Sequence, residues 1–157
     1  MNTKSAAIIV LGVMLWGTVH AQRITVSGNE FAVDGNRIWL NGANTPWDNW
    51  EDFGGNFDAA WWDSHFSALH DAGINNTRVW ISCNGQRGLT ISETGYVEGP
   101  TAQFLEDLDS LMAIAARHEV YVMAALISFD HTKDGSPYVD RWRAMYGSRT
   151  NMDSFAE

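Results

Sequence analysis

The stretch GINNTRVWIS, residues 73–82, is echoed 46 residues later by EVYVMAALIS, residues 119–128. Both stretches follow a predicted helix and finish on Ile-Ser, and the second is an almost uninterrupted apolar run. Such runs are typical of parallel strands that are covered on both faces. The echo therefore predicts a repeated helix-strand unit, and such units joined by right-handed crossovers build an α/β fold.

Two amphipathic helices are predicted next to these strands. The first extends over residues 58–72, with Asp58 as its N-cap and Gly73 as its stop signal. The second begins behind Thr101, which is a favourable capping residue. The apolar positions that recur at helical spacing are Trp62, Phe66 and Leu69 in the first helix and Phe104, Leu108, Leu111 and Ala115 in the second.

Strands and turns are predicted around the helices. Asp34-Gly35-Asn36 is a strong hairpin signal, so a small hairpin is expected to lead into a first strand over residues 37–42. The second and third strands are expected over residues 76–82 and 120–128. Residues 88–99, in the loop after the second strand, are predicted to form a small hairpin of their own.

This order of elements fits two α/β architectures, a doubly wound open sheet and a (β/α)8 barrel. Sequence period alone does not separate them. No glycine-rich G-x-G-x-x-G or P-loop pattern follows any of the predicted strands, which argues against a nucleotide-binding open sheet. The loops after the strands are rich in Trp, Asn and Asp instead.

Amino-acid composition and net charge limit the classes of partner that the protein can bind. The chain has 157 residues, of which 45% are hydrophobic and 18% charged, as in globular proteins. A formal net charge of −9 argues against nucleic acid as a partner, because phosphate binding requires a Lys/Arg surface. Eight Trp residues are well above ordinary usage, and their flat rings can either stack on sugar faces or fill a core.

The N-terminus is predicted to be a secretory signal peptide over residues 1–21, cut after Ala21. It has Lys4 at its positive end and an apolar run over residues 6–16 that is too short to span a bilayer. The alternative is an uncleaved membrane anchor. Cleavage would leave residues 22–157 as a secreted domain, extracellular or periplasmic and off the membrane. Cys83 is the one cysteine, so an internal disulfide is excluded.

Candidate ligand-binding residues follow the predicted strands, because α/β folds bind ligands at the carboxyl ends of parallel strands. Rings in these loops are expected to stack on sugars, and amide, carboxylate and imidazole groups to bond hydroxyls. A solvated loop or a core position is the competing interpretation for each residue. The candidates are Trp47, Trp50, Trp80 and Trp142 for stacking, and Asn44, Asn84, Asp130 and His131 for hydroxyls.

A metal site is not expected. His65 and His70 are five residues apart on a helix, which does not place them on one face, and no H-E-x-x-H motif occurs. No cofactor is expected either.

Three motifs resemble clan A glycoside hydrolases, most closely glycoside hydrolase family 5 with its endo-β-1,4-mannanases and cellulase-like enzymes. They are FAVDGNRIWLNGANTPW at 31–47, HFSALHDAGINNTRVWIS at 65–82 and VYVMAALISFDH at 120–131. The most specific part is the pattern G-I-N-x-T-R-V-W at 73–80. The resemblance covers residues 24–157 and implies about three βα units at the start of a (β/α)8 TIM barrel, preceded by a small hairpin.

The resemblance also implies a role for Arg78, at the position where the family has an arginine that bonds the nucleophilic carboxylate. Strand alternation agrees, because Arg78, Trp80 and Ser82 share one face while Val79 and Ile81 share the other. A buried guanidinium needs a partner, and a carboxylate would satisfy it. The family commonly has a histidine after strand three, and the order Phe-Asp-His here leaves open whether Asp130 or His131 contacts sugar.

The two catalytic glutamates of the family, after strands four and seven, have no counterpart here. The final residues 151–157 resemble the first turn of a third barrel helix. The chain is therefore expected to be the N-terminal part of a longer retaining glycosidase, inactive alone. The first choice is a mannan endo-1,4-β-mannosidase acting on β-1,4-linked polysaccharide. The alternatives are a cellulase, a non-catalytic carbohydrate-binding protein and a half-barrel that dimerises.

Overall fold

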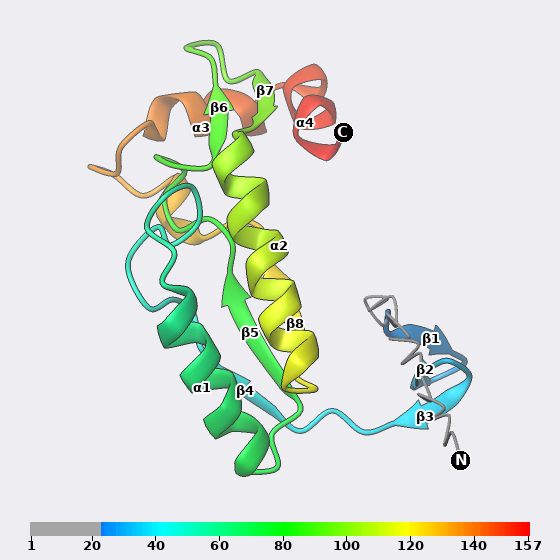
Figure 1. The fold of residues 1–157 in the computed structure, drawn as a ribbon. Helices are drawn as coiled ribbons and strands as arrows, with labels where there is room; N and C mark the ends of the chain where they lie inside the picture. The colour runs from blue at the N-terminus through cyan, green and yellow to red at the C-terminus, as the bar shows by residue number, and fades with distance from the viewer. Residues whose placement is uncertain (1–22) are drawn as a thin grey trace, which may run out of the picture.

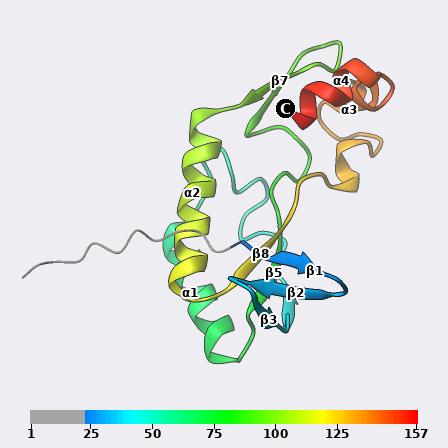
Figure 2. The ribbon, with the colours of Figure 1, turned by 90° about the vertical axis from the view of Figure 1, so that its right-hand side faces the viewer.

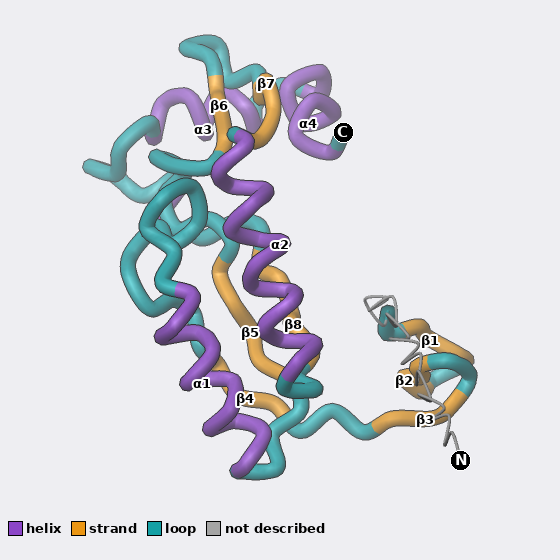
Figure 3. The backbone as a smooth tube through the Cα atoms, in the orientation of Figure 1, coloured by secondary structure: helices purple, strands orange, loops and turns teal. Residues whose placement is uncertain are grey.

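The computed structural model describes residues 23–157, so the predicted signal peptide lies outside the described residues (Figure 1). Helices and strands alternate along this part of the chain, which confirms the predicted α/β class (Figure 3). The strands are β1 Thr25–Ser27, β2 Glu30–Val33, β3 Asn36–Ile38, β4 Gly42–Asn44, β5 Asn76–Trp80, β6 Leu89–Ile91, β7 Val97–Pro100 and β8 Tyr121–Ala125. The helices are α1 Ala59–Asp71, α2 Ala102–Arg117, α3 Val139–Tyr146 and α4 Arg149–Ala156, with a 3-10 turn at Phe129–His131.

A parallel sheet in the order β4-β5-β8 is the centre of the molecule. Asn44 pairs with Arg78, and Arg78 with Met123, so these three residues form one row across the sheet. Helices α1 and α2 lie on the same side of this sheet (Figures 1 and 2). Val79 is fully buried in the core between sheet and helices, whereas Arg78 and Trp80 are only half-buried on the opposite face, as strand alternation predicts.

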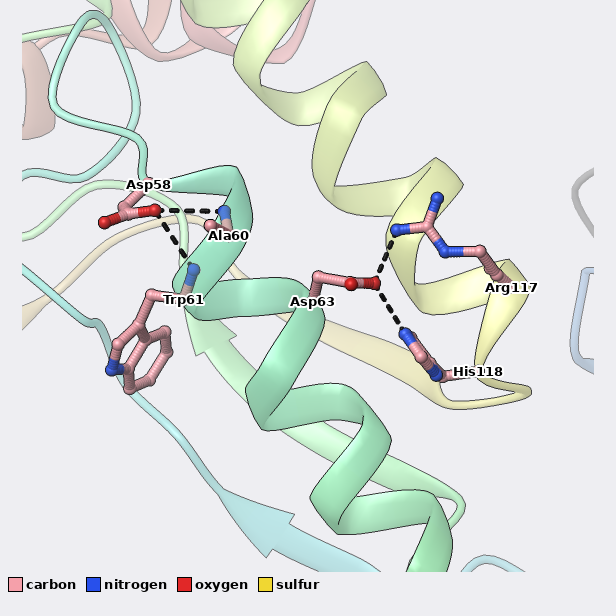
Figure 4. Close-up of polar contacts among 6 residues, drawn as sticks. All are labelled: Asp58, Ala60, Trp61, Asp63, Arg117 and His118. Atoms are coloured by element: carbon pink, nitrogen blue, oxygen red, sulfur yellow. Dashed lines mark hydrogen bonds and ion pairs between the residues drawn. The ribbon is translucent and has the colours of Figure 1, made fainter.

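Helix α1 begins and ends where the sequence predicts. The Asp58 side chain accepts bonds of 3.0 Å from the backbone N–H groups of Ala60 and Trp61, which caps the free donors of the first turn (Figure 4). At the other end Gly73 has φ of 73°, a left-handed conformation that glycine adopts readily. The predicted core residues Trp62, Phe66 and Leu69 are all buried.

Helix α2 is capped by Thr101 and packs beside α1. The two helices are also joined at their surface, where Asp63 Oδ1 lies 2.7 Å from His118 Nε2 and 2.5 Å from Arg117 Nη2 (Figure 4). The hydrogen bonds from His118 and Arg117 lower the pKa of Asp63. The predicted apolar face is confirmed for Phe104, Leu111 and Ala115, which are buried, and for Leu108, which is partly buried against the same core.

The predicted first strand over residues 37–42 is wrong in extent, because the chain leaves one sheet and enters another within it. Residues 36–38 pair with β2, and β4 begins at Gly42. Between them the Asn75 side chain accepts from Asn41 N at 2.8 Å and donates to the Trp39 carbonyl at 2.8 Å. These bonds satisfy backbone groups that a continuous strand would have paired with a neighbour.

The N-terminal strands β1, β2 and β3 form a separate antiparallel sheet (Figure 1). The turn between β2 and β3 has positive φ at Asp34 and at Gly35, which is the backbone that a tight hairpin requires, so the predicted hairpin is confirmed. The second predicted hairpin is confirmed by the pairing of β6 with β7. Within residues 23–157 no helix is long and apolar enough to cross a membrane.

Helices α3 and α4 pack with the β6–β7 hairpin at the end of the molecule toward which β5 points (Figure 1). Val97 N donates to Ser154 Oγ at 3.0 Å, and Asn151 Nδ2 donates to the Thr94 carbonyl at 2.8 Å. Residues 151–157 were expected to begin a third barrel helix. They are mostly helical, as part of α4, and this helix packs against β7. Helix α3 was not predicted because its N-cap, Tyr138, has a φ of 58° and no capping side-chain bond.

Candidate functional site

Arg78 lies half-buried on the face of the parallel sheet opposite α1 and α2. Its Nη1 donates to Asn44 Oδ1 at 3.2 Å, and its Cζ lies 5.1 Å from the centre of the Trp80 ring. No carboxylate of residues 23–157 forms an ion pair with it. A guanidinium carries five N–H donors, so most of the donors of Arg78 remain available to an anionic group.

Four aromatic residues, which we call the aromatic cluster, gather where the parallel strands end: Trp47, Trp50, Trp80 and Phe129. The Trp47 ring centre lies 5.1 Å from that of Trp50 and 5.0 Å from that of Trp80. Phe129 continues the series at 6.5 Å from Trp80. Trp50 is 40% exposed and Phe129 is 67% exposed. Exposed rings beside half-buried ones offer apolar faces to a ligand.

The structure thus brings together four of the predicted ligand-binding residues, Asn44, Trp47, Trp50 and Trp80, next to Arg78. Phe129 was missed. Its position directly after an apolar strand is the same signal that indicates the tryptophans as ligand-binding residues.

Trp142 is a correction to the predicted set. Its side chain is fully buried, so no face of the ring is open to a sugar. The ring packs in a second hydrophobic cluster and meets the His131 ring edge-on at 4.5 Å. This cluster joins α3 to the β6–β7 hairpin, and its other buried members are Ile91, Val97 and Met145.

His131 is a second correction, because it is also fully buried. One ring nitrogen, Nε2, lies 3.0 Å from Ser82 Oγ, and the other, Nδ1, lies 2.9 Å from the Ser128 carbonyl oxygen. Both nitrogens are therefore occupied within the protein. The imidazole holds the loop after β8 against the end of β5 and has no contact left for a sugar hydroxyl.

Asp130 and Asn84 are likewise buried, and their side chains bond to neighbouring residues of their own loops. The Asp130 carboxylate lies 3.4 Å from Lys133 Nζ and accepts from the Ser128 hydroxyl at 3.4 Å. The Asn84 side-chain oxygen accepts from Gln86 N at 3.2 Å. Of the two alternative sugar contacts after the third strand, His131 is fully buried and Asp130 is 7% exposed.

Three buried carboxylates organise the loop after β4: Glu51, Asp52 and Asp107. Each accepts two backbone N–H bonds, at distances between 2.5 and 2.9 Å. Burial raises the pKa of Glu51 and of Asp52. The sequence does not predict these anchors, because Glu51 and Asp52 have the residue types of a solvated loop and Asp107 that of an exposed helix position. The donors are Asn84 and Gly85 for Glu51, Asp48 and Asn49 for Asp52, and Gly54 and Gly55 for Asp107.

Cys83 is buried and free, and burial raises the pKa of its thiol to about 11. A protonated, buried thiol is a poor nucleophile. Among the described residues no group of three or more His, Cys, Asp or Glu side chains is placed to hold a metal ion.

We expect His131 to make stability sensitive to acid. Burial lowers the pKa of His131 from 6.5, so the folded protein keeps it neutral. As pH falls through about 6.5, the unfolded chain takes up a proton that the folded chain does not, and the free energy of unfolding drops. Denaturant titrations between about pH 7 and pH 5 should show a shallower loss of stability for His131→Gln than for the parent or for His70→Gln, whose histidine is exposed. Equal slopes in all three proteins would contradict this expectation.

Comparisons with known proteins agree with the fold. No family model matches the chain. A mannan endo-1,4-beta-mannosidase of Mytilus edulis is 29% identical over 123 residues, which cover 76% of this chain and 34% of that protein. A protein of the same name from Cryptopygus antarcticus is 25% identical over 114 residues, covering 67% of this chain and 29% of that protein.

The fold is also similar to solved structures of β-mannanases. The β-mannanase structure from Mytilus edulis superposes with a TM-score of 0.69 at 25% identity, over 87% of this chain and 39% of that chain. The β-1,4-D-mannanase from Cryptopygus antarcticus gives a TM-score of 0.73 at 20% identity, over 85% of this chain and 37% of that chain. The chain spans about a third of the length of the curated relatives that it matches. These matches confirm the resemblance read from the motifs, and the chain is similar to part of the mannan endo-1,4-β-mannosidases of glycoside hydrolase family 5.

Proposed function

We propose that this chain is part of a mannan endo-1,4-β-mannosidase, in which it supplies a sugar-binding surface and a guanidinium that orients a catalytic carboxylate. The observation that carries the proposal is the aromatic cluster beside Arg78, at the ends of parallel strands. Sugar rings have apolar faces that pack on indole rings, and their hydroxyls bond polar groups such as Asn44. The names of the similar proteins favour mannan as the polysaccharide.

We further propose that β4, β5 and β8 are the first three strands of a (β/α)8 barrel. The parallel order β4-β5-β8 and the two helices that follow β4 and β5 support this architecture. Barrel enzymes assemble their sites from loops at the carboxyl ends of the strands, which is where the aromatic cluster lies. The remaining strands would cover the sheet face that carries Arg78, Trp80 and Met123.

In the proposed mechanism two carboxyl groups act on the glycosidic bond with retention, one as acid and then base, the other as nucleophile. These groups belong to parts of the enzyme beyond this chain. Arg78 donates N–H bonds to the nucleophilic carboxylate, which keeps it ionised and fixes its direction of attack. The aromatic cluster holds the sugar chain while the bond breaks.

We also propose that the enzyme is exported from the cell. The support is the N-terminal pattern of residues 1–21, with a positive start, a short apolar run and a small residue at Ala21. A polysaccharide too large to enter a cell would be met by such an enzyme outside the cytoplasm. N-terminal sequencing of the protein recovered from culture medium should begin at Gln22.

The sugar-binding role predicts that Trp50→Ala in the full-length enzyme raises KM on mannan oligosaccharides by about tenfold, equivalent to about 1.4 kcal/mol of lost binding. The melting temperature should change little, because Trp50 is already 40% exposed. Steady-state kinetics and thermal melts measure the two effects. Trp61→Ala is the matched control, since Trp61 is half-buried in α1 and stacks on His65 away from the cluster. An unchanged KM for Trp50→Ala would remove the cluster from substrate binding.

A further inference from the structure

Glu51 directly follows Trp50 and is unusual in two respects. Its side chain is a carboxylate, yet the residue is 3% exposed. Its φ is 57°, in a left-handed region that non-glycine residues rarely occupy and that persists where surrounding contacts enforce it. The contacts around Glu51 therefore help to fix the backbone conformation directly after Trp50.

Those contacts join two loops that are distant in sequence. Glu51 Oε1 accepts from Asn84 N at 2.5 Å and from Gly85 N at 2.8 Å, across 33 and 34 residues of chain. Hydrogen bonds to a charged acceptor are the stronger kind. The second oxygen, Oε2, is buried and has no hydrogen-bond partner among the described residues. One oxygen of this carboxylate thus binds the backbone of the loop that follows β5.

Gly85 brings a third segment to the same point. It has φ of 74°, and a side-chain Cβ at this position would lie 2.3 Å from Cζ2 and from Nε1 of Trp142. The glycine thus lets the ring of α3 pack directly on the backbone that Glu51 holds. The loops after β4 and β5 and helix α3 consequently meet around one glycine.

The two segments that Glu51 joins carry three of the four rings of the aromatic cluster, Trp47, Trp50 and Trp80. Trp47 and Trp50 precede it in the loop after β4, and Trp80 ends β5 four residues before Asn84. We propose that Glu51 is a positioning residue, which sets Trp47 and Trp50 against Trp80 through its bonds to Asn84 and Gly85. This inference rests on the proposed sugar-binding function of the cluster.

The test uses the full-length enzyme and three substitutions at one position. Glu51→Ala and Glu51→Met remove both accepted bonds, and Met also keeps the space filled. Glu51→Gln retains one oxygen that can accept from both N–H groups. We expect Ala and Met to raise KM on mannan oligosaccharides by about tenfold with kcat changed less, within the roughly 100-fold that a displacement of ~1 Å can cause. Gln should stay within about threefold of the parent.

Two readouts separate positioning from general stability. Near-ultraviolet circular dichroism, which reports the packing of aromatic rings, should change in Glu51→Ala and Glu51→Met and be restored in Glu51→Gln. Asp107→Ala is the matched control, because Asp107 is 6% exposed and also accepts two N–H bonds from the loop after β4, at Gly54 and Gly55, which Ala removes. It should lower the melting temperature and leave KM unchanged.

A double-mutant cycle with Trp50→Ala tests whether Glu51 acts through the ring. The effects on KM should be non-additive, since a ring that is absent cannot be mispositioned. Additive effects, or a KM raised equally by Asp107→Ala, would overturn the proposal. So would failure of both Glu51→Ala and Glu51→Met to fold, because Glu51 would then be required for the fold itself.

The same variants keep this proposal distinct from the sugar-binding function. If Trp50→Ala and Trp47→Ala leave KM unchanged, the cluster does not bind substrate and both proposals fail. If those variants raise KM while Glu51→Ala and Glu51→Met change neither KM nor the circular dichroism, the cluster binds sugar without help from Glu51, and positioning alone is refuted.

Discussion

Replacing Arg78 with Lys is expected to lower kcat/KM of the full-length enzyme on mannan oligosaccharides by roughly 100-fold or more, with the fold retained. Lys keeps the positive charge but loses the planar fork that donates two directed bonds to a carboxylate. Arg78 is only half-buried, and its one described side-chain hydrogen bond goes to Asn44, so little of the fold depends on it.

The pH dependence of Arg78→Lys gives a second reading of the same role. Hydrogen bonds to the ionised form of a carboxylate lower its pKa, so losing them should raise the pKa of the nucleophile. The acidic limb of the kcat/KM profile would then move to higher pH. Arg37→Lys is the control, since Arg37 forms an exposed ion pair with Glu30 in the N-terminal sheet. Normal turnover with an unmoved limb would leave Arg78 with a structural task alone.

Trp142→Ala is expected to have the largest effect on stability, a loss of about 3–5 kcal/mol in the free energy of unfolding. The ring is fully buried between α3 and the β6–β7 hairpin, and it packs on the Gly85 backbone. Its Nε1 has no hydrogen-bond partner in the described chain, so the loss would come from packing and from the cavity left behind.

Denaturant unfolding of Trp142→Ala, Trp142→Phe and Trp50→Ala measures this difference. Phe keeps part of the ring volume and should lose less stability than Ala. Trp50→Ala removes the same side chain from a site that is 40% exposed and should cost far less. If Trp142→Ala retained its stability and raised KM instead, Trp142 would be a ligand contact after all.

The helices and the central strands could be predicted because their causes are local. Asp58 caps α1 through the next three residues, and the spacing of Trp62, Phe66 and Leu69 fixes the face that is buried. Alternation along β5 is local too, and it placed Arg78 and Trp80 on one face. Three members of the aromatic cluster followed from one rule, that ligands meet the carboxyl ends of parallel strands.

Other positions depend on contacts that no local pattern carries. The first strand is shorter than predicted because the Asn75 side chain, 36 residues away from Trp39, forms the hydrogen bonds that a strand neighbour would otherwise form with this connection. Helix α3 begins at Tyr138 without a capping bond, so it had no start signal. Its burial of Trp142 follows from packing on a hairpin and a loop elsewhere in the chain.

The sequence by itself determined helices α1 and α2, the two hairpins and the direction of the faces of β5, because capping, periodicity and turn signals act between near neighbours. The tertiary structure alone decided which loop residues are free for a ligand. Trp50 and Trp142 are the same residue type and both were expected in loops after parallel strands, yet Trp50 is 40% exposed in its loop and Trp142 is fully buried in helix α3. Glu51 became an anchor in the same way, since its donors Asn84 and Gly85 are brought to it only when β4 and β5 pair.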